Sequence, residues 1–171
     1  ERFKETWSDY YQIMRRKGVS PEDAKTAVRT STTLIGAMLV RRGDADALIC
    51  GSIGRYQDHL KHVNDVIGRE ENASIFAAMN LLPMQNRTLF ISDTYVNHDP
   101  SAQEIAEITI MAADEVKRFG LAPKVALVSH SNFGTEVSPS ATKMSDALDI
   151  IEKLDPSIEI DGEMHGDAAL N

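Results

Sequence analysis

The stretch "KVALVSHSNFG", Lys124–Gly134, decides the fold class. It begins as a short apolar strand without alternation, which is typical of a strand buried on both faces of a sheet. An amphipathic helix with serine capping signals is predicted on each side, over residues 102–119 and 138–154. Because parallel strands need a long crossover between them, this helix–strand–helix order predicts an α/β fold.

The rest of the chain continues the alternation. Further helices are predicted over residues 1–17, 21–29, 32–42 and 54–67. Further strands are predicted over residues 47–50, 73–82, 87–92 and 157–163, with "PMQN" as the turn after residue 82. Together these elements predict one three-layer α/β/α unit, residues 1–171, with a mostly parallel sheet. The chain begins without methionine inside a helical pattern, so we expect a piece of a longer protein.

Composition limits the classes of partner. The 171 residues carry a net charge of −8, which argues against duplex nucleic acid or an anionic membrane as the main partner. No apolar run approaches the roughly 18 residues of a membrane span. The single cysteine, Cys50, excludes an internal disulfide and fits a reducing cytoplasm. We expect Cys50 to be a small buried side chain at the end of its strand.

Ligands of open parallel sheets bind outside the carboxyl ends of the strands, so the segments that follow the strands are the candidate sites. The first is "GSIGRYQDHLK", in which the backbone of Gly51, Ser52 and Gly54 can approach a phosphate. Arg55 and Lys61 add positive charge at and after the helix start. The alternative is a tight strand-to-helix turn that precedes a solvated basic face.

The second candidate segment is "SHSNFGTE", directly after the best-defined strand. Ser129 and Ser131 flank His130, and Gly134 permits a left-handed turn. Side chains of adjacent residues diverge, so a serine–histidine nucleophile is not expected here. We expect these hydroxyls, with the amide of Asn132, to hold a ligand; a plain surface loop is the alternative.

Four other residues are weighed as candidates. Asp93 and Asp167 either cap their own loops or hold a ligand hydroxyl. His59 and His62 have a spacing that suits a shared metal, but no third ligand is placed to join them, so no metal site is predicted.

Five segments fall in an order and spacing that resemble the phosphate acetyl/butyryltransferase family, which moves an acyl group between coenzyme A and inorganic phosphate. They are "YYQIMRRKGVSPEDA", "IGAMLVRRGDADALICG", "LFISDTYVNHDPSAQEIAEI", "KVALVSHSNFGTE" and "IDGEMHGDAAL". The resemblance implies two α/β lobes in an isocitrate-dehydrogenase-like arrangement around a cleft. This chain is similar to one of these two lobes. The family's serine–arginine pair and catalytic aspartate correspond to positions beyond Asn171, so no catalytic residue is expected here.

One segment departs from the family pattern. Transferases usually carry a histidine and a pair of small hydroxyls where this chain has Gly54, Arg55 and Tyr56, and an arginine where it has Lys61. Lysine keeps the charge but lacks the planar two-pronged hydrogen bonding of arginine. "RYQDHL" and "SNFG" are similar to the phosphotransacetylase-like C-terminal domain of large bacterial NADP-dependent malic enzymes. That resemblance implies an acetyl-CoA-binding regulatory and oligomerisation domain without transferase activity.

This reading names a ligand and partners. Acetyl-CoA or a related ester would be bound by Gly51, Ser52, Gly54, Arg55, Lys61, Ser129, His130, Ser131, Asn132, Gly134 and Asp167. The domain itself would hold no cofactor. NADP and a divalent metal would belong to a malic-enzyme domain in the same chain, which converts malate to pyruvate, and the chain would form a homo-oligomer.

Two alternatives stay open. The first is an active phosphate acetyltransferase. The second is a lobe that only provides a dimer surface, anchored by Trp7, Tyr10 and Tyr11 on the first helix, although a core role fits their spacing equally.

Overall fold

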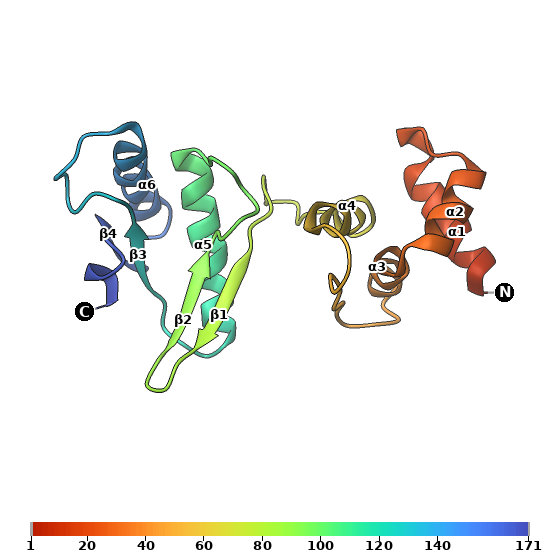
Figure 1. The fold of residues 1–171 in the computed structure, drawn as a ribbon, viewed down its shortest axis with the longest axis horizontal. Coiled ribbons are helices and arrows are strands. Elements are labelled where there is room, and N and C mark those ends of the chain that lie inside the picture. Colours follow the sequence, from red (N-terminus) through yellow and green to blue (C-terminus); the bar gives the residue numbers. More distant parts are fainter. Residues whose placement is uncertain (1, 171) are drawn as a thin grey trace. The chain divides into compact units, whose positions relative to one another are not determined.

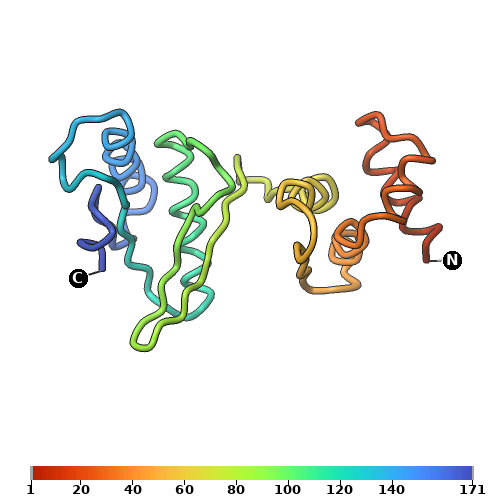
Figure 2. The backbone as a smooth tube through the Cα atoms, viewed as in Figure 1, coloured from red at the N-terminus to blue at the C-terminus, as the bar shows by residue number. Residues whose placement is uncertain are grey.

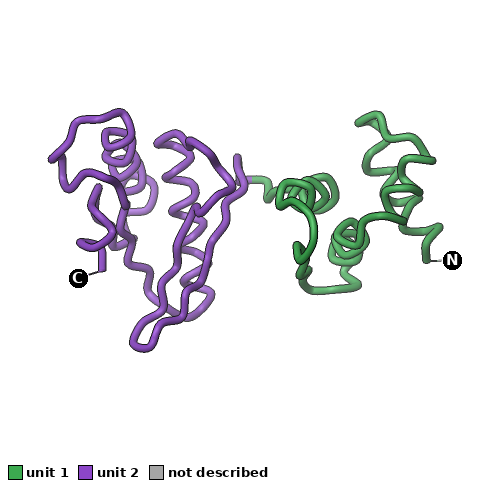
Figure 3. The backbone as a smooth tube through the Cα atoms, in the orientation of Figure 1, with its two compact units in different colours: residues 1–71 green, residues 72–171 purple. Residues whose placement is uncertain are grey.

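The computed structural model describes residues 2–170 (Figure 1). The chain divides into two compact units, residues 1–71 and residues 72–171 (Figure 3). Each unit has its own hydrophobic core.

The first unit is built from helices. They are α1 (Arg2–Met14), the short 3-10 helix η1 (Arg15–Lys17), α2 (Pro21–Thr30), α3 (Thr32–Arg42) and α4 (Tyr56–Val66). Local signals set their ends. Gly18 has a φ of 86° and ends η1. Ser20 is the N-cap of α2 and forms a capping box with Asp23, and Pro21 is the first residue of the helix. The predicted helices of this unit are therefore confirmed, within a residue or two at each end.

The core of the first unit is formed by side chains from all four α-helices. Tyr10, Met14, Leu34, Met38 and Val66 are all buried to 4% exposure or less. Trp7 and Tyr11 are partly buried and pack against this cluster. The aromatic side chains of α1 therefore contribute to the core of their own unit.

The predicted strand over residues 47–50 is wrong. These residues form no strand, Cys50 is exposed, and Ile49 is 99% exposed. Leu48 alone turns inward, to the space beside Gly36 in α3. A strand needs a neighbour to receive its backbone hydrogen bonds, and in the described part of this unit no strand offers one.

The second unit combines helices and strands. Its elements are β1 (Met79–Pro83), β2 (Thr88–Ser92), α5 (Ala102–Arg118), β3 (Lys124–Val128), α6 (Pro139–Leu154), β4 (Glu159–Met164) and η2 (Ala168–Leu170). β3 pairs with β4 in parallel through the crossover helix α6, and α5 packs beside α6 (Figure 1). Ala106, Leu127, Ala147 and Ile151 form the centre of the core between them. The α/β class is confirmed.

The sheet arrangement differs from the expectation. β1 and β2 form an antiparallel pair, and within residues 2–170 the strands make two separate two-stranded sheets. The reason is the short "PMQN" turn, closed by a hydrogen bond from Met84 N to Arg87 O of 2.8 Å, because a connection this short allows only an antiparallel pair. Figure 2 shows this hairpin projecting past the end of α5. The prediction of one lobe over the whole chain stays a prediction.

None of the helices in the described residues is long and apolar enough to cross a membrane.

A β-bulge near the end of β4 sets the geometry of the region that follows. Leu127 pairs with Gly162, but Val128 pairs with Met164, so Glu163 is left without a partner in the ladder. Gly162 has a φ of 140°, and a Cβ placed on it would lie 2.8 Å from Leu127 O. Only glycine fits this position without a shift of backbone.

Replacing Gly162 with alanine should therefore destabilise the protein. We expect Gly162→Ala to lower the free energy of unfolding by about 2 kcal/mol or more, because it combines an unfavourable φ with a clash against backbone. Gly166→Ala is the matched control, since the nearest atom to its added Cβ is Val128 Cγ1 at 3.9 Å. Urea unfolding of both variants tests this, and equal stabilities would contradict it.

Candidate functional site

The buried carboxylate of Glu163 holds the loop that follows β3. Glu163 is 4% exposed, and its Oε1 accepts hydrogen bonds from Ser131 Oγ at 3.0 Å and from Gly134 N at 2.7 Å. Its backbone oxygen accepts from Phe133 N at 2.8 Å. The Gly134 N–H, together with the Ser131 hydroxyl, holds the pKa of Glu163 below its usual value. The carboxylate is therefore stabilised in its ionised form.

The same loop is also held by His165, which follows β4. His165 N donates to Asn132 Oδ1 at 2.6 Å, and Asn132 Nδ2 lies 3.2 Å from His165 Nδ1. His165 Nε2 lies 2.8 Å from the carbonyl oxygen of His130, which can only accept. The neutral imidazole with its proton on Nε2 satisfies all three contacts. The side chain of Asn132 is thus fixed by the end of β4.

His130 lies on the outer side of the loop and is exposed. Its Nε2 is 3.0 Å from Ser138 Oγ and 3.6 Å from Glu136 Oε1. Ser138 is also the N-cap of α6, because its hydroxyl accepts from Ala141 N. His130 therefore links the loop to the start of α6.

The predicted residues of this loop divide by exposure. Ser131 is fully buried, and its hydroxyl also accepts from Glu136 N at 3.1 Å, so it supports the loop from inside. His130 and Gly134 are exposed, and Ser129 and Asn132 are partly buried. The binding role of these residues stays a prediction.

The first candidate segment lies in the other unit, between residues 51 and 61. Gly51 and Gly54 have φ values of 96° and 105°, and both glycines and Ser52 are exposed. Arg55 precedes α4 as its N-cap residue, and its guanidinium pairs with Asp58, with Nε 3.1 Å from Oδ2. Lys61 pairs with Asp65 one turn further along α4. The segment thus places two exposed cations after a turn that needs glycine.

His59 has a structural role. Its Nδ1 lies 2.7 Å from Thr33 Oγ1, and its Nε2 lies 2.8 Å from the carbonyl oxygen of Ile53. The ring therefore ties the turn before α4 to α3. Across residues 2–170, no group of three or more His, Cys, Asp and Glu side chains is arranged to hold a metal ion.

The two candidate aspartates behave differently. Asp93 accepts hydrogen bonds from Ala78 N at 3.0 Å and from Asn97 N at 2.7 Å, so it caps the loop after β2. Burial on its own raises the pKa of Asp93, but these hydrogen bonds outweigh it and the pKa lies below its usual value. Asp167 is exposed, and its Oδ1 accepts from Ala168 N at 3.0 Å.

The sequence did not predict the role of several residues that position this loop. Glu163, His165, Glu136 and Ser138 make the contacts that position the loop over residues 129–134. The segment "DGEMHGDAA" begins within the predicted strand over residues 157–163, and a glycine inside a strand often marks a bulge. Asp167 alone was selected from that segment.

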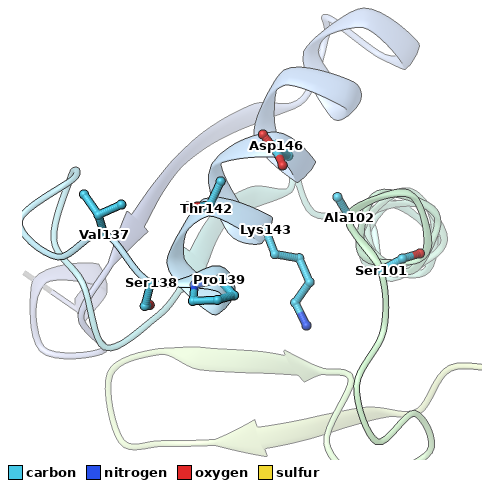
Figure 4. Close-up of a pocket in the computed structure, with 8 residues that line it drawn as sticks. All are labelled: Ser101, Ala102, Val137, Ser138, Pro139, Thr142, Lys143 and Asp146. Carbon is cyan, nitrogen blue, oxygen red and sulfur yellow. The ribbon is translucent and has the colours of Figure 1, made fainter.

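An open pocket of about 560 Å³ lies between the starts of α5 and α6. Figure 4 shows Ser101 and Ala102 on one side and Ser138, Pro139 and Thr142 on the other, with Lys143 extending from α6 into the space between the helices. Lys143 pairs with Asp99, which precedes α5. The positive charge in this pocket is therefore already matched by a carboxylate.

The ionised state of Glu163 predicts a pH dependence of stability. Its pKa is lower in the folded than in the unfolded state, so its contribution is present above the unfolded pKa of about 4.3 and is lost as the pH falls through the folded pKa. We expect Glu163→Gln to cost about 1–3 kcal/mol at pH 7 and to flatten the decline of stability below pH 5.

Glu159→Gln is the matched control, because Glu159 lies on the same strand but is exposed and pairs with exposed Lys124. Urea unfolding between pH 3 and pH 7 measures both variants. An acid dependence of Glu163→Gln equal to that of the unsubstituted protein would contradict the assignment.

Comparison with known proteins gives the family. The model of the phosphate acetyl/butaryl transferase family matches residues 1–171. The chain is 52% identical to the NADP-dependent malic enzyme of Escherichia coli over 169 residues and 52% identical to the NAD-dependent malic enzyme of Rhizobium meliloti over 170 residues. Each match covers 99% of this chain, and the chain spans 22% of the length of each relative.

Solved structures agree with the sequence matches. A phosphotransacetylase from Streptococcus pyogenes superposes with a TM-score of 0.85 at 30% identity, covering 98% of this chain and 51% of that one. The same family is indicated by the five sequence segments, by the fold of the described residues and by the family match. The chain belongs to the phosphate acetyl/butaryl transferase family.

Proposed function

We propose that this domain binds acetyl-CoA, or a related CoA ester, and thereby regulates a malic-enzyme domain in the same chain. One observation carries the proposal. The chain is 52% identical to two malic enzymes but 30% identical to the Streptococcus pyogenes phosphotransacetylase. Each of these matches covers nearly the whole of this chain. Since the chain spans 22% of those malic enzymes, most of each relative lies outside the matched region.

The segment before α4 supports binding of a phosphate-bearing ligand. Arg55 and Lys61 are 81% and 66% exposed in their side chains, so both are accessible to an anion. The side chain of Arg55 does not cap α4, and the N-terminus of a helix favours negative charge. A coenzyme A ester carries several phosphates, and these two exposed cations and the helix N-terminus offer it positive charge, although each cation is also paired with a carboxylate, Asp58 or Asp65.

The same segment argues against transferase chemistry. A Cβ on Gly54 would lie 3.2 Å from His59 Nε2, so the histidine that the family pattern carries at this position would crowd His59. Phosphoryl and acyl transfer depend on charge stabilisation by groups held in fixed geometry. The exposed, flexible ammonium of Lys61 provides this less well than an arginine fork.

Regulation follows if the ester binds two states of the assembly with different affinity. A ligand shifts a conformational equilibrium only by its difference in affinity between the states. The malic-enzyme domain would use NADP or NAD and a divalent metal, and the bound ester would act as a feedback inhibitor. We propose that the family domain also assembles the homo-oligomer through which this effect spreads.

Titration calorimetry of the full-length protein with acetyl-CoA tests the proposal, together with malate oxidation measured with and without acetyl-CoA. We expect saturable heat and inhibition over the same concentration range. Lys61→Gln should weaken binding about five- to tenfold, because it removes one charge-assisted contact. Arg118→Gln is the control, since exposed Arg118 pairs with Glu115 at the end of α5. Absence of heat at millimolar acetyl-CoA in a folded sample would refute the proposal.

An active phosphate acetyltransferase is the second candidate, favoured by the TM-score of 0.85 to a phosphotransacetylase. A thiol-release assay with acetyl-CoA and phosphate decides between the two. We expect no activity in the unsubstituted protein or in the double variant Arg55→Ser with Lys61→Arg, which restores part of the family pattern. Robust formation of acetyl phosphate by the unsubstituted protein would favour the transferase.

A further inference from the structure

One carboxylate in the first unit is shared by two lysines. Asp65 Oδ1 accepts from Lys17 Nζ at 3.3 Å, and Asp65 Oδ2 accepts from Lys61 Nζ. The side chain of Asp65 is only 10% exposed, whereas those of Lys17 and Lys61 are 56% and 66% exposed. Burial on its own raises the pKa of Asp65, but the two lysines outweigh it and the pKa lies below its usual value. Asp65 is therefore an ionised, largely buried group that pairs with two exposed cations.

The geometry of α4 allows the side chain of Lys61 an orientation other than the one in which it pairs with Asp65. Side chains on an α-helix lean toward its N-terminus, and Lys61 lies about 9 Å along the axis from Arg55. Its long side chain can therefore lean toward Asp58, three residues earlier on a neighbouring part of the helix surface, and toward the Arg55 guanidinium that pairs with Asp58. In this structure it pairs instead with Asp65, one turn nearer the C-terminus, with the lysine before the aspartate. This order is the weaker of the two for an i,i+4 ion pair.

The surroundings leave Lys61 only partly neutralised. Lys17 and Lys61 carry two positive charges against the single negative charge of Asp65. The neighbouring Tyr10 is buried, and its pKa is raised by burial and by Asp65, so it stays uncharged at neutral pH. The hydrogen bond to Asp65 raises the pKa of Lys61, and Lys17 shares the same carboxylate through its other oxygen.

We propose that Asp65 competes with a phosphate of the bound ligand for Lys61, and that Lys17 sets the strength of this competition. The Lys17–Asp65–Lys61 cluster then determines the affinity of the domain for its ligand. This inference rests on the proposed function, since it concerns the same ester-binding site. A purely structural role for the cluster, which ties η1 to α4, is the alternative that the experiment must exclude.

The test is titration calorimetry of the full-length protein with acetyl-CoA. Asp65→Asn should tighten binding about fivefold, because Lys61 loses its competing partner. The double variant Asp65→Asn with Lys61→Gln should lose this gain. Asp9→Asn is the matched control, because it also removes one negative charge and one ion pair, with Arg42, in the same unit. A similar gain in Asp9→Asn, or no gain in Asp65→Asn, would overturn the inference.

A second pair of variants keeps the test decisive if Asp65→Asn does not fold. Lys17→Gln leaves Asp65 to Lys61 alone and should weaken binding about twofold. Lys25→Gln removes the same charge from a lysine paired with Glu22 and should leave the affinity unchanged. Unchanged or tighter binding by Lys17→Gln would contradict the inference. Failure of the unsubstituted protein to bind acetyl-CoA would instead refute the proposed function.

Discussion

The carboxylate of Glu163 holds the second unit's candidate loop in place. A buried carboxylate is costly unless hydrogen bonds compensate it, and here the Gly134 N–H and the Ser131 hydroxyl both do so. Glu163 reaches them because the bulge after Gly162 releases it from the ladder between β3 and β4. The position of the loop over residues 129–134 thus depends on one glycine and one glutamate of a strand that follows it by about thirty residues.

The contacts of His165 make the same loop specific in its orientation. The amide oxygen of Asn132 accepts from His165 N, and its amide nitrogen donates to the His165 ring, so its side chain cannot rotate without losing one contact. His130 is held at its carbonyl by the same ring, while its own imidazole faces Ser138 and Glu136. The exposed groups of the loop are therefore set by β4 and by the start of α6, and a ligand would meet a preformed surface.

The sequence predicted those parts of the fold that local signals specify. The starts of α5 and α6 follow from Ser101 with Glu104 and from Ser138 with Pro139, which act within one helical turn. The prediction of a strand over residues 47–50 was wrong, because a strand needs a second strand from elsewhere in the chain to pair with its backbone. The contacts of Glu163 were not predictable either, since they join residues 29 and 32 positions apart. Lys61 with Asp65 could be read from an i,i+4 spacing, but Lys17, 48 positions from Asp65, could not.

Under the proposed function, a lysine in place of the family's arginine would suit a domain that senses acetyl-CoA. An arginine fork gains from a fixed, two-pronged contact, and catalysis uses such fixed geometry to stabilise developing charge. A lysine ammonium is a compact charge on a flexible stem, and Lys61 already shares Asp65 with Lys17. If Lys61 exchanges Asp65 for a phosphate of the ligand, as we propose, it changes its partner without a large net gain of energy. That near balance would be a disadvantage for an enzyme that must stabilise a transition state, but under the proposed function it would allow the domain to bind and release acetyl-CoA as the concentration of acetyl-CoA changes.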